Sequence, residues 1–175
     1  MKNISFVKMH GLGNDFVMVD CLNGVPLPDE QLSAFSTAVC DRNFGVGGDG
    51  LILILPDEQA DFRMRMWNPD GSESEMCGNG IRCFGKYLFD RNLVGESAVS
   101  VATTKGLQRI EIQANGVQPG AREIMVRVDM GTPHLKRSEI PMIPLPGGND
   151  PQVINQPLQV GQNEYSITAQ FQRLT

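Results

Sequence analysis

The sequence predicts a protein of mixed α and β structure in which short strands outnumber helices. Three observations support this prediction. Short runs rich in β-forming residues recur along the chain, two longer segments have helical spacing, and 19 glycines and 11 prolines among 175 residues indicate many turns. A chain of this length can bury one full core, and it approaches the length at which a second, smaller core can form.

The first half of the chain contains most of the clear element signals. Residues 3–8 and 15–20 are rich in β-formers and flank a Gly-Leu-Gly-Asn loop, which predicts a pair of strands around a tight turn that carries Asn14. Residues 29–41 have apolar positions at helical spacing and acidic residues in the first turn, which predicts a helix. The apolar run 51–55 and the alternating segment 62–66 predict two further strands before an Asn-Pro-Asp-Gly turn.

The second half of the chain begins with another predicted helix and ends in a stretch of different composition. An apolar stripe predicts a helix from Gly78 or Asn79 to about residue 92. Strands are then predicted at 98–103, 107–113 and 122–129. Residues 133–157 hold six prolines, which is typical of a linker, and 158–171 could form one hairpin. We therefore expect a domain at 1–133, and at 134–175 a linker with the incomplete start of a second domain.

Charge and hydropathy exclude several classes of function. The net charge of −5 gives no basic surface for nucleic acid or anionic lipid. We find no apolar run of the roughly 20 residues that a membrane span needs, and the first residues lack the apolar stretch of a signal peptide. We expect a cytoplasmic protein that binds neither nucleic acid nor a membrane. The four cysteines match no common zinc spacing and are interpreted as free thiols, with no metal site expected.

Cys77 is the strongest candidate for chemistry because it lies between a turn and the first turn of a helix. Unpaired N–H groups and the helix dipole at such a position favour a thiolate. Gly78 and Gly80 let a substrate approach the backbone, where the same N–H groups could hold a carboxylate. The alternative is that Cys77 is only a small apolar residue at the end of a loop.

The other cysteines and the histidines have simpler explanations. Cys83 lies six residues further along the predicted helix and is therefore rotated by about 240° from Cys77, toward the core. Cys21 follows a strand and Cys40 lies on an apolar helical stripe, so packing explains both. The histidines, His10 and His134, are too far apart for a convincing metal site.

Four motifs occur in an order that is similar to that of the diaminopimelate epimerase family. They are KMHGLGNDF at 8–16, GVGGDG at 45–50, WNPDGS at 67–72 and MCGNGIR at 76–82. The resemblance covers residues 3–133 well and continues more loosely to about residue 167. It implies an α+β fold of two similar domains, each a curved, mostly antiparallel β-sheet wrapped around a central helix, with the active site in the cleft between them.

The resemblance also implies the chemistry and its residues. Family members interconvert LL- and meso-2,6-diaminopimelate with two cysteines and no cofactor, in lysine and peptidoglycan-precursor biosynthesis. By resemblance Cys77 is one catalytic cysteine, Asn14 and Asn68 bind the substrate, and Gly78 and Asn79 bind it through the backbone. A thiolate and a thiol on opposite faces of the α-carbon provide the base and the acid that inversion requires. An amide suits a zwitterionic substrate because it offers a donor and an acceptor without charge.

The chain departs from the family after the first domain. The family's second cysteine lies in an Ala-Cys-Gly-Thr-Gly type segment, which we do not find before Thr175. We therefore expect a truncated chain that is inactive or nearly so by itself, with a small-molecule amino acid as ligand and a homodimer as a further option. Two alternatives stay open. One is a binding module that retains the ligand-facing residues without turnover, and the other is a proline-racemase-like enzyme, whose motif has His where this chain has Asn79.

Overall fold

The structure of the protein is a computed structural model that describes residues 3–140 and 152–169. The chain divides into two compact units, Met1–Asp129 and Met130–Thr175. Within the described residues, no helix is long and apolar enough to cross a membrane.

The described part of the first unit holds an eight-stranded sheet and two helices. The elements in chain order are β1 (Val7–Gly11), β2 (Asn14–Asp20), α1 (Asp29–Cys40), β3 (Gly50–Leu55), β4 (Phe62–Trp67), β5 (Glu73–Ser74), α2 (Gly78–Asp90), β6 (Ala98–Thr103), β7 (Gly106–Gln113) and β8 (Met125–Val128). The strands pair in the order β1-β2-β3-β4-β6-β7-β8, and β5 pairs with β4. Among these pairs, β2 with β3 and β4 with β6 are parallel and the others are antiparallel, which confirms the predicted mostly antiparallel sheet.

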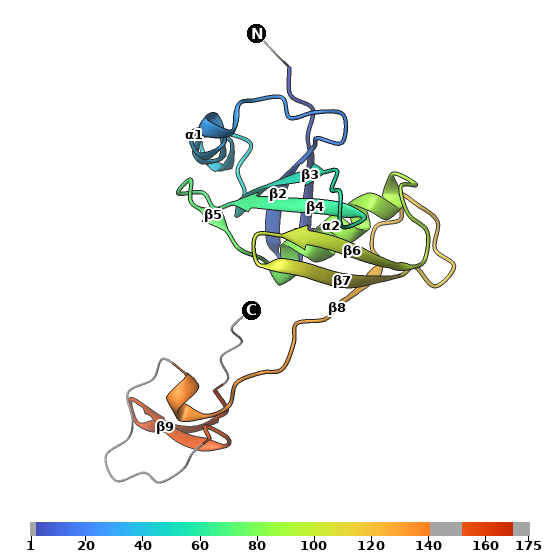
Figure 1. Ribbon diagram of the computed structural model, residues 1–175. Helices are drawn as coiled ribbons and strands as arrows, with labels where there is room; N and C mark the ends of the chain where they lie inside the picture. The colour runs from blue at the N-terminus through green and yellow to red at the C-terminus, as the bar shows by residue number, and fades with distance from the viewer. Residues whose placement is uncertain (1–2, 141–151, 170–175) are drawn as a thin grey trace. The chain divides into compact units, whose positions relative to one another are not determined.

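The sheet curves around α2, as Figure 1 shows. The helix contacts both edge strands, β1 and β8, as well as β2 and β7. A flat sheet of this width could not bring both of its edges to one helix. Ile81, Phe84 and Leu88 on α2 are completely buried, so this helix forms the centre of the core. The predicted central helix is therefore confirmed.

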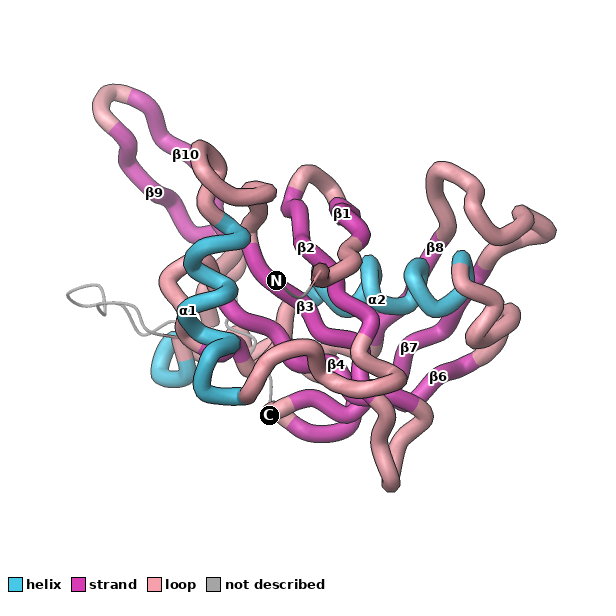
Figure 2. The backbone as a smooth tube through the Cα atoms, turned by 90° about the horizontal axis from the view of Figure 1, so that it is seen from above, coloured by secondary structure: helices cyan, strands magenta, loops and turns pink. Residues whose placement is uncertain are grey.

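The second helix, α1, lies on the opposite face of the sheet and contacts β3 and β4 (Figure 2). A second apolar cluster joins Leu32 of α1 to side chains of β2 and β3, among them Val17 and Leu53. Since β3 is covered on both faces, Leu51–Ile54 are all buried. This double burial explains why the segment reads as a continuous apolar run rather than as an alternating one.

The turn between β1 and β2 starts the sheet with a tight hairpin. Gly11 pairs with Asn14, which leaves Leu12 and Gly13 as a two-residue loop. Both have positive φ, of 55° and 90°, as hairpin loops of this length prefer. The hairpin was predicted, but its first strand runs over 7–11 rather than 3–8.

The second unit contains a short helical turn and one hairpin. These elements are η1 (Arg137–Glu139), β9 (Gln156–Val160) and β10 (Asn163–Ile167). Antiparallel pairing of β9 with β10 confirms the hairpin predicted at 158–171, as far as residue 169. Residues 141–151 of the predicted linker lie outside the described residues. The proposed domain boundary at 133–134 stays a prediction.

Candidate active site

Cys77 is the N-cap residue of α2. Its backbone is extended, with φ −135° and ψ 119°, and its Sγ accepts a hydrogen bond from the backbone N–H of Gly80 at 3.4 Å. The N–H of Ile81 donates to the Cys77 carbonyl at 2.8 Å. Of the first N–H groups of the helix, those of Gly78 and Asn79 are left without a bond inside it. The sulfur therefore lies at the positive end of the helix dipole.

The short strand β5 brings the chain to this position. Glu73 and Ser74 pair with Trp67 and Met66 at the end of β4, and the chain then turns into α2. Gly80, in the first turn of α2, lies close to β3 and β4. A Cβ atom added there would lie 3.0 Å from Ile52 Cδ1 and 3.3 Å from Cys77 Cβ, so the helix start packs tightly against the sheet.

Asn14 lies next to Cys77. Its side-chain Oδ1 accepts from the thiol, with Sγ 3.8 Å away. Its Nδ2 donates to Asp49 Oδ2 at 2.8 Å. Both Asn14 and Cys77 are half-buried. The structure therefore brings together two of the predicted site residues that are 63 positions apart in the sequence.

Asn68 lies at the same end of the sheet. It follows β4 directly, and the register pairs Trp67 with Leu51 at the start of β3, while Gly50 pairs with Phe16 near the start of β2. The Asn68 side chain donates to Ser72 Oγ at 3.0 Å, and its carbonyl accepts from Ser36 Oγ on α1 at 2.9 Å. Asn68 is thus fixed by its own turn, and β3 lies between its strand and that of Asn14.

Gly78 and Asn79 occupy the first turn of α2 and are half-buried. The Asn79 side-chain oxygen accepts from Arg82, so the backbone N–H is the group that Asn79 offers at the helix start. These N–H groups, together with the dipole, form an arrangement that can bind a carboxylate. All five predicted site residues hence lie at the start of α2 or at the ends of β2 and β4.

Several charged residues lie beside Asn14, and the sequence analysis did not predict them as site residues. Arg42 donates to Asp15 Oδ1 and to Asp49 Oδ1, each at 2.7 Å, and Lys8 Nζ lies 3.0 Å from Asp15 Oδ2. The hydrogen bonds from Arg42 hold the pKa of the Asp15 carboxyl well below its usual value. Asp15 and Asp49 both belong to the quoted motifs, which was the available signal, whereas Arg42 lies outside them.

The other three cysteines differ from Cys77 in burial. Cys21, Cys40 and Cys83 expose 1%, 2% and 4% of their surface. Burial raises the pKa of Cys21 and of Cys83 to about 11, and it also raises the pKa of Cys40. These three thiols are therefore almost completely buried, whereas Cys77 is half-buried.

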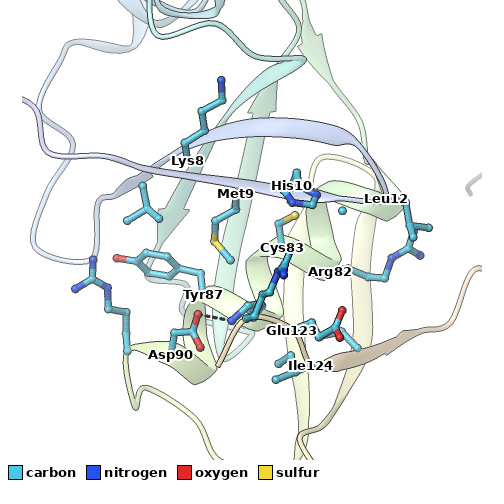
Figure 3. A pocket seen from close by; sticks show the side chains of 16 residues that line it. Lys8, Met9, His10, Leu12, Arg82, Cys83, Tyr87, Asp90, Glu123 and Ile124 are labelled. Atoms are coloured by element: carbon cyan, nitrogen blue, oxygen red, sulfur yellow. Dashed lines mark hydrogen bonds and ion pairs between the residues drawn. The ribbon is translucent and has the colours of Figure 1, made fainter. Parts of the chain in front are cut away.

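A cavity of about 840 Å³ lies elsewhere in the first unit, between β1, α2 and residues 122–126 (Figure 3). Cys83, Tyr87 and His10 line it, and the five predicted site residues do not. His134, in the second unit, instead pairs with Glu139. Among the described residues, no three His, Cys, Asp or Glu side chains lie together as a metal would require.

Comparison with known proteins identifies relatives over most of the chain. The family model described as diaminopimelate epimerase matches residues 6–136. A diaminopimelate epimerase of Pelotomaculum thermopropionicum is 49% identical over 94% of this chain and 55% of its own length. One from Desulforudis audaxviator is 49% identical over 95% of this chain and 56% of its own. The chain thus spans about half the length of the curated relatives it matches.

Solved structures share the fold at lower identity. A PhzF-family phenazine biosynthesis protein of Bacillus anthracis matches with a TM-score of 0.60 at 25% identity, over 78% of this chain and 43% of its own. A probable proline racemase of Agrobacterium radiobacter matches with a TM-score of 0.57 at 17% identity, over 95% of this chain and 48% of its own. The curved sheet around a central helix is therefore a known architecture.

Proposed function

The chain belongs to the diaminopimelate epimerase family, and on that premise we propose that it forms the Cys77 half of an amino-acid epimerase that interconverts LL- and meso-2,6-diaminopimelate without a cofactor. One observation carries the proposal. Cys77 alone among the four cysteines is not buried, and it lies at a helix start beside the amide of Asn14.

The Cys77 thiolate removes the α-proton in one direction of the reaction. The Cα–H bond breaks, the proton moves to Sγ, and the electron pair stays on the α-carbon and its carboxylate. A thiol on the opposite face then donates a proton to that carbon, which inverts it. Since Cys21, Cys40 and Cys83 are buried, the second thiol has to come from outside residues 1–175.

The start of α2 holds the substrate carboxylate during this transfer. The N–H groups of Gly78 and Asn79 and the helix dipole favour a negative charge there, and they stabilise the charge that develops as the proton leaves. Asn14 and Asn68 add uncharged amides for the ammonium and carboxylate groups of the substrate.

The wider setting follows from the same proposal. The substrate is a small zwitterionic amino acid, and the reaction belongs to lysine and peptidoglycan-precursor biosynthesis in the cytoplasm. We assign residues 1–133 to the first domain of the enzyme and 134–175 to a linker and the start of a second domain. Self-association into a homodimer is part of the proposal.

The test is exchange of the α-proton of diaminopimelate in D₂O, followed by proton NMR. One thiol suffices to remove and return a proton on one face, so the 175-residue chain should show exchange without inversion. Cys77→Ala should abolish the exchange. Cys83→Ala, in the same helix but buried, is the matched control and should retain it. Exchange that continues unchanged in Cys77→Ala would remove Cys77 as the base.

A binding module is the second candidate, because the chain offers one thiol that is not buried and spans about half of its relatives. Calorimetry with diaminopimelate separates the two functions. Saturable binding without any exchange would favour the module over the epimerase half.

A further inference from the structure

Asp49 is bonded at both carboxylate oxygens beside the candidate site. Its Oδ2 accepts from Asn14 Nδ2 at 2.8 Å and from the backbone N–H of Asp15 at 2.9 Å. Its Oδ1 accepts from Arg42 Nη2 at 2.7 Å. Arg42 in turn binds the Asp15 carboxylate. The position of Asp49 is therefore fixed by three independent bonds.

This arrangement determines which way the Asn14 amide faces. A carboxylate paired with a guanidinium has only acceptor atoms, so the amide group that faces Asp49 must be the NH₂. The amide oxygen then faces the other side, where Cys77 Sγ lies 3.8 Å away. Turning the amide over would bring its oxygen against Asp49 Oδ2, where two acceptors would repel each other.

Two hydrogen bonds with opposite preferences consequently meet at the Cys77 sulfur. The N–H of Gly80 donates to Sγ at 3.4 Å and favours the thiolate. Asn14 Oδ1 can only accept, so its contact with Sγ is favourable for the protonated thiol and unfavourable for the thiolate. The orientation of one amide therefore shifts the balance between the acid and the base form of Cys77.

We propose that Asp49 is a positioning residue that holds the Asn14 amide oxygen against Cys77 and thereby favours the thiol. It acts through Asn14 and not by contact with the sulfur. Its importance for turnover rests on the epimerase function proposed above, whereas its effect on the resting thiol does not.

Other titratable groups surround Cys77 and have to be considered. Its own helix carries Arg82, which is bonded to Asn79, and Cys83. Burial is the main cause that raises the pKa of Cys83, and the charge of Cys77 is the second. On the facing strands and loop are Asp15, Arg42 and Asp49 itself. Removing the negative charge of Asp49 would by itself also favour the thiolate, so charge and positioning have to be separated by experiment.

The experiment follows the pH dependence of iodoacetamide alkylation, detected by mass spectrometry. In the native chain this reagent reports on Cys77, because the other cysteines are buried. Asp49→Ala removes the charge and the acceptor, and Cys77 should be alkylated about threefold faster at pH 7, with the profile shifted to lower pH. Asp49→Asn removes the charge but keeps an oxygen for Asn14 Nδ2 and the Asp15 N–H, so its shift should be clearly smaller than that of Asp49→Ala.

Two controls make the result decisive. Asp57→Ala removes a carboxylate that likewise pairs with an arginine and accepts from backbone N–H groups, beyond the far end of β3, and it should leave the profile unchanged. In an Asn14→Ala background, Asp49→Ala should have only the smaller effect of the lost charge. Equal shifts in Asp49→Ala and Asp49→Asn, or a full shift in the Asn14→Ala background, would overturn the proposal in favour of charge alone. Loss of α-proton exchange in Cys77→Ala is a separate result that tests the function.

Discussion

At the scale of single residues, burial separates the thiols of this protein into two kinds. Cys21 and Cys83 are almost completely buried, and burial raises the pKa of each to about 11 from an ordinary value of 9.0. A buried thiol resists ionisation because its charged form would lose the hydration that it has in the unfolded chain.

This difference predicts how stability depends on pH. Below pH 9 both states keep the thiol protons, so the contribution of the thiols to stability is fully present. Between about pH 9 and 11 the unfolded chain loses protons that the folded chain retains, so the free energy of unfolding falls as pH rises. The expected slope is roughly 1.4 kcal/mol per pH unit for each thiol. Urea denaturation at several pH values measures it, and Cys21→Ala should flatten the slope. The same slope in that variant and in wild type would contradict the assignment.

Sequence reasoning selected the candidate thiol and the Asn14 amide beside it, but not the charged residues around Asn14. Cys77 could be selected because its place at a helix start is a local property, visible within a few residues. The contact of Asp49 with Asn14 joins residues 35 positions apart, and Arg42 carried no local signal. Such pairs depend on which strands become neighbours, which a single sequence does not state.

At the scale of elements, the loop after α1 connects the helix end to the candidate site. The N–H groups of Gly45, Val46 and Gly48 donate to the carbonyls of Asp41, Val39 and Cys40, at 2.9 to 3.1 Å. These bonds satisfy carbonyls that the helix end leaves unpaired. The same loop then leads to Asp49. The glycines of the GVGGDG motif therefore cap the C-terminal end of α1, and the motif positions Asp49 beside the candidate site.

Gly45→Ala should destabilise the protein strongly. A Cβ atom at this position would lie 2.8 Å from the Val39 oxygen, 2.9 Å from the Asp41 oxygen and closer still to that of Ala38. These are backbone atoms of a helix end, which cannot yield without breaking the cap. We expect a loss of about 2 kcal/mol or more in urea denaturation, together with a changed rate of Cys77 alkylation.

Gly95→Ala is the matched control for this change, because nothing lies within 4 Å of a Cβ atom there. The free energy of unfolding of this variant should lie within about 0.5 kcal/mol of the wild-type value. Its Cys77 should be alkylated at the wild-type rate. Equal stability of the two variants would show that the loop moves easily and does not form a rigid cap.

Sequence patterns predicted helices and strands correctly where the periodic segment was long. They failed where a strand forms only by pairing with a neighbouring strand. Residues 29–41 and 78–92 were predicted as helices, and α1 and α2 occupy 29–40 and 78–90. The two-residue strand β5 was not predicted, because two residues carry no periodic signal and form a strand only by pairing with β4. The strand predicted at 122–129 is shorter, at 125–128, since only these residues pair with β7.

At the scale of the whole molecule, the curvature of the sheet could be predicted from the resemblance to a known family. It could not be predicted from the spacing of apolar residues. Apolar spacing predicted α2 as a helix with an apolar stripe, but it gives neither the central place of this helix nor the order of the strands. The parallel pairs β2 with β3 and β4 with β6 join segments that helices or loops separate. The four motifs supplied the curved sheet around a central helix, because they indicate a fold that is already known, but they did not state these parallel pairs.

The division of the chain into two units leads to the last prediction. The central helix and the strands that it contacts all lie within Met1–Asp129, and the described strands of the second unit form one hairpin, which is marginally stable by itself. A fragment of residues 1–133 should therefore unfold cooperatively in urea at nearly the same midpoint as the 175-residue chain, and its Cys77 should be alkylated at the same rate. Residues 134–175 alone should show no cooperative transition by circular dichroism. A fragment 1–133 that is unfolded, or whose midpoint falls clearly, would mean that the first core depends on residues beyond 133, and the proposed boundary would have to move.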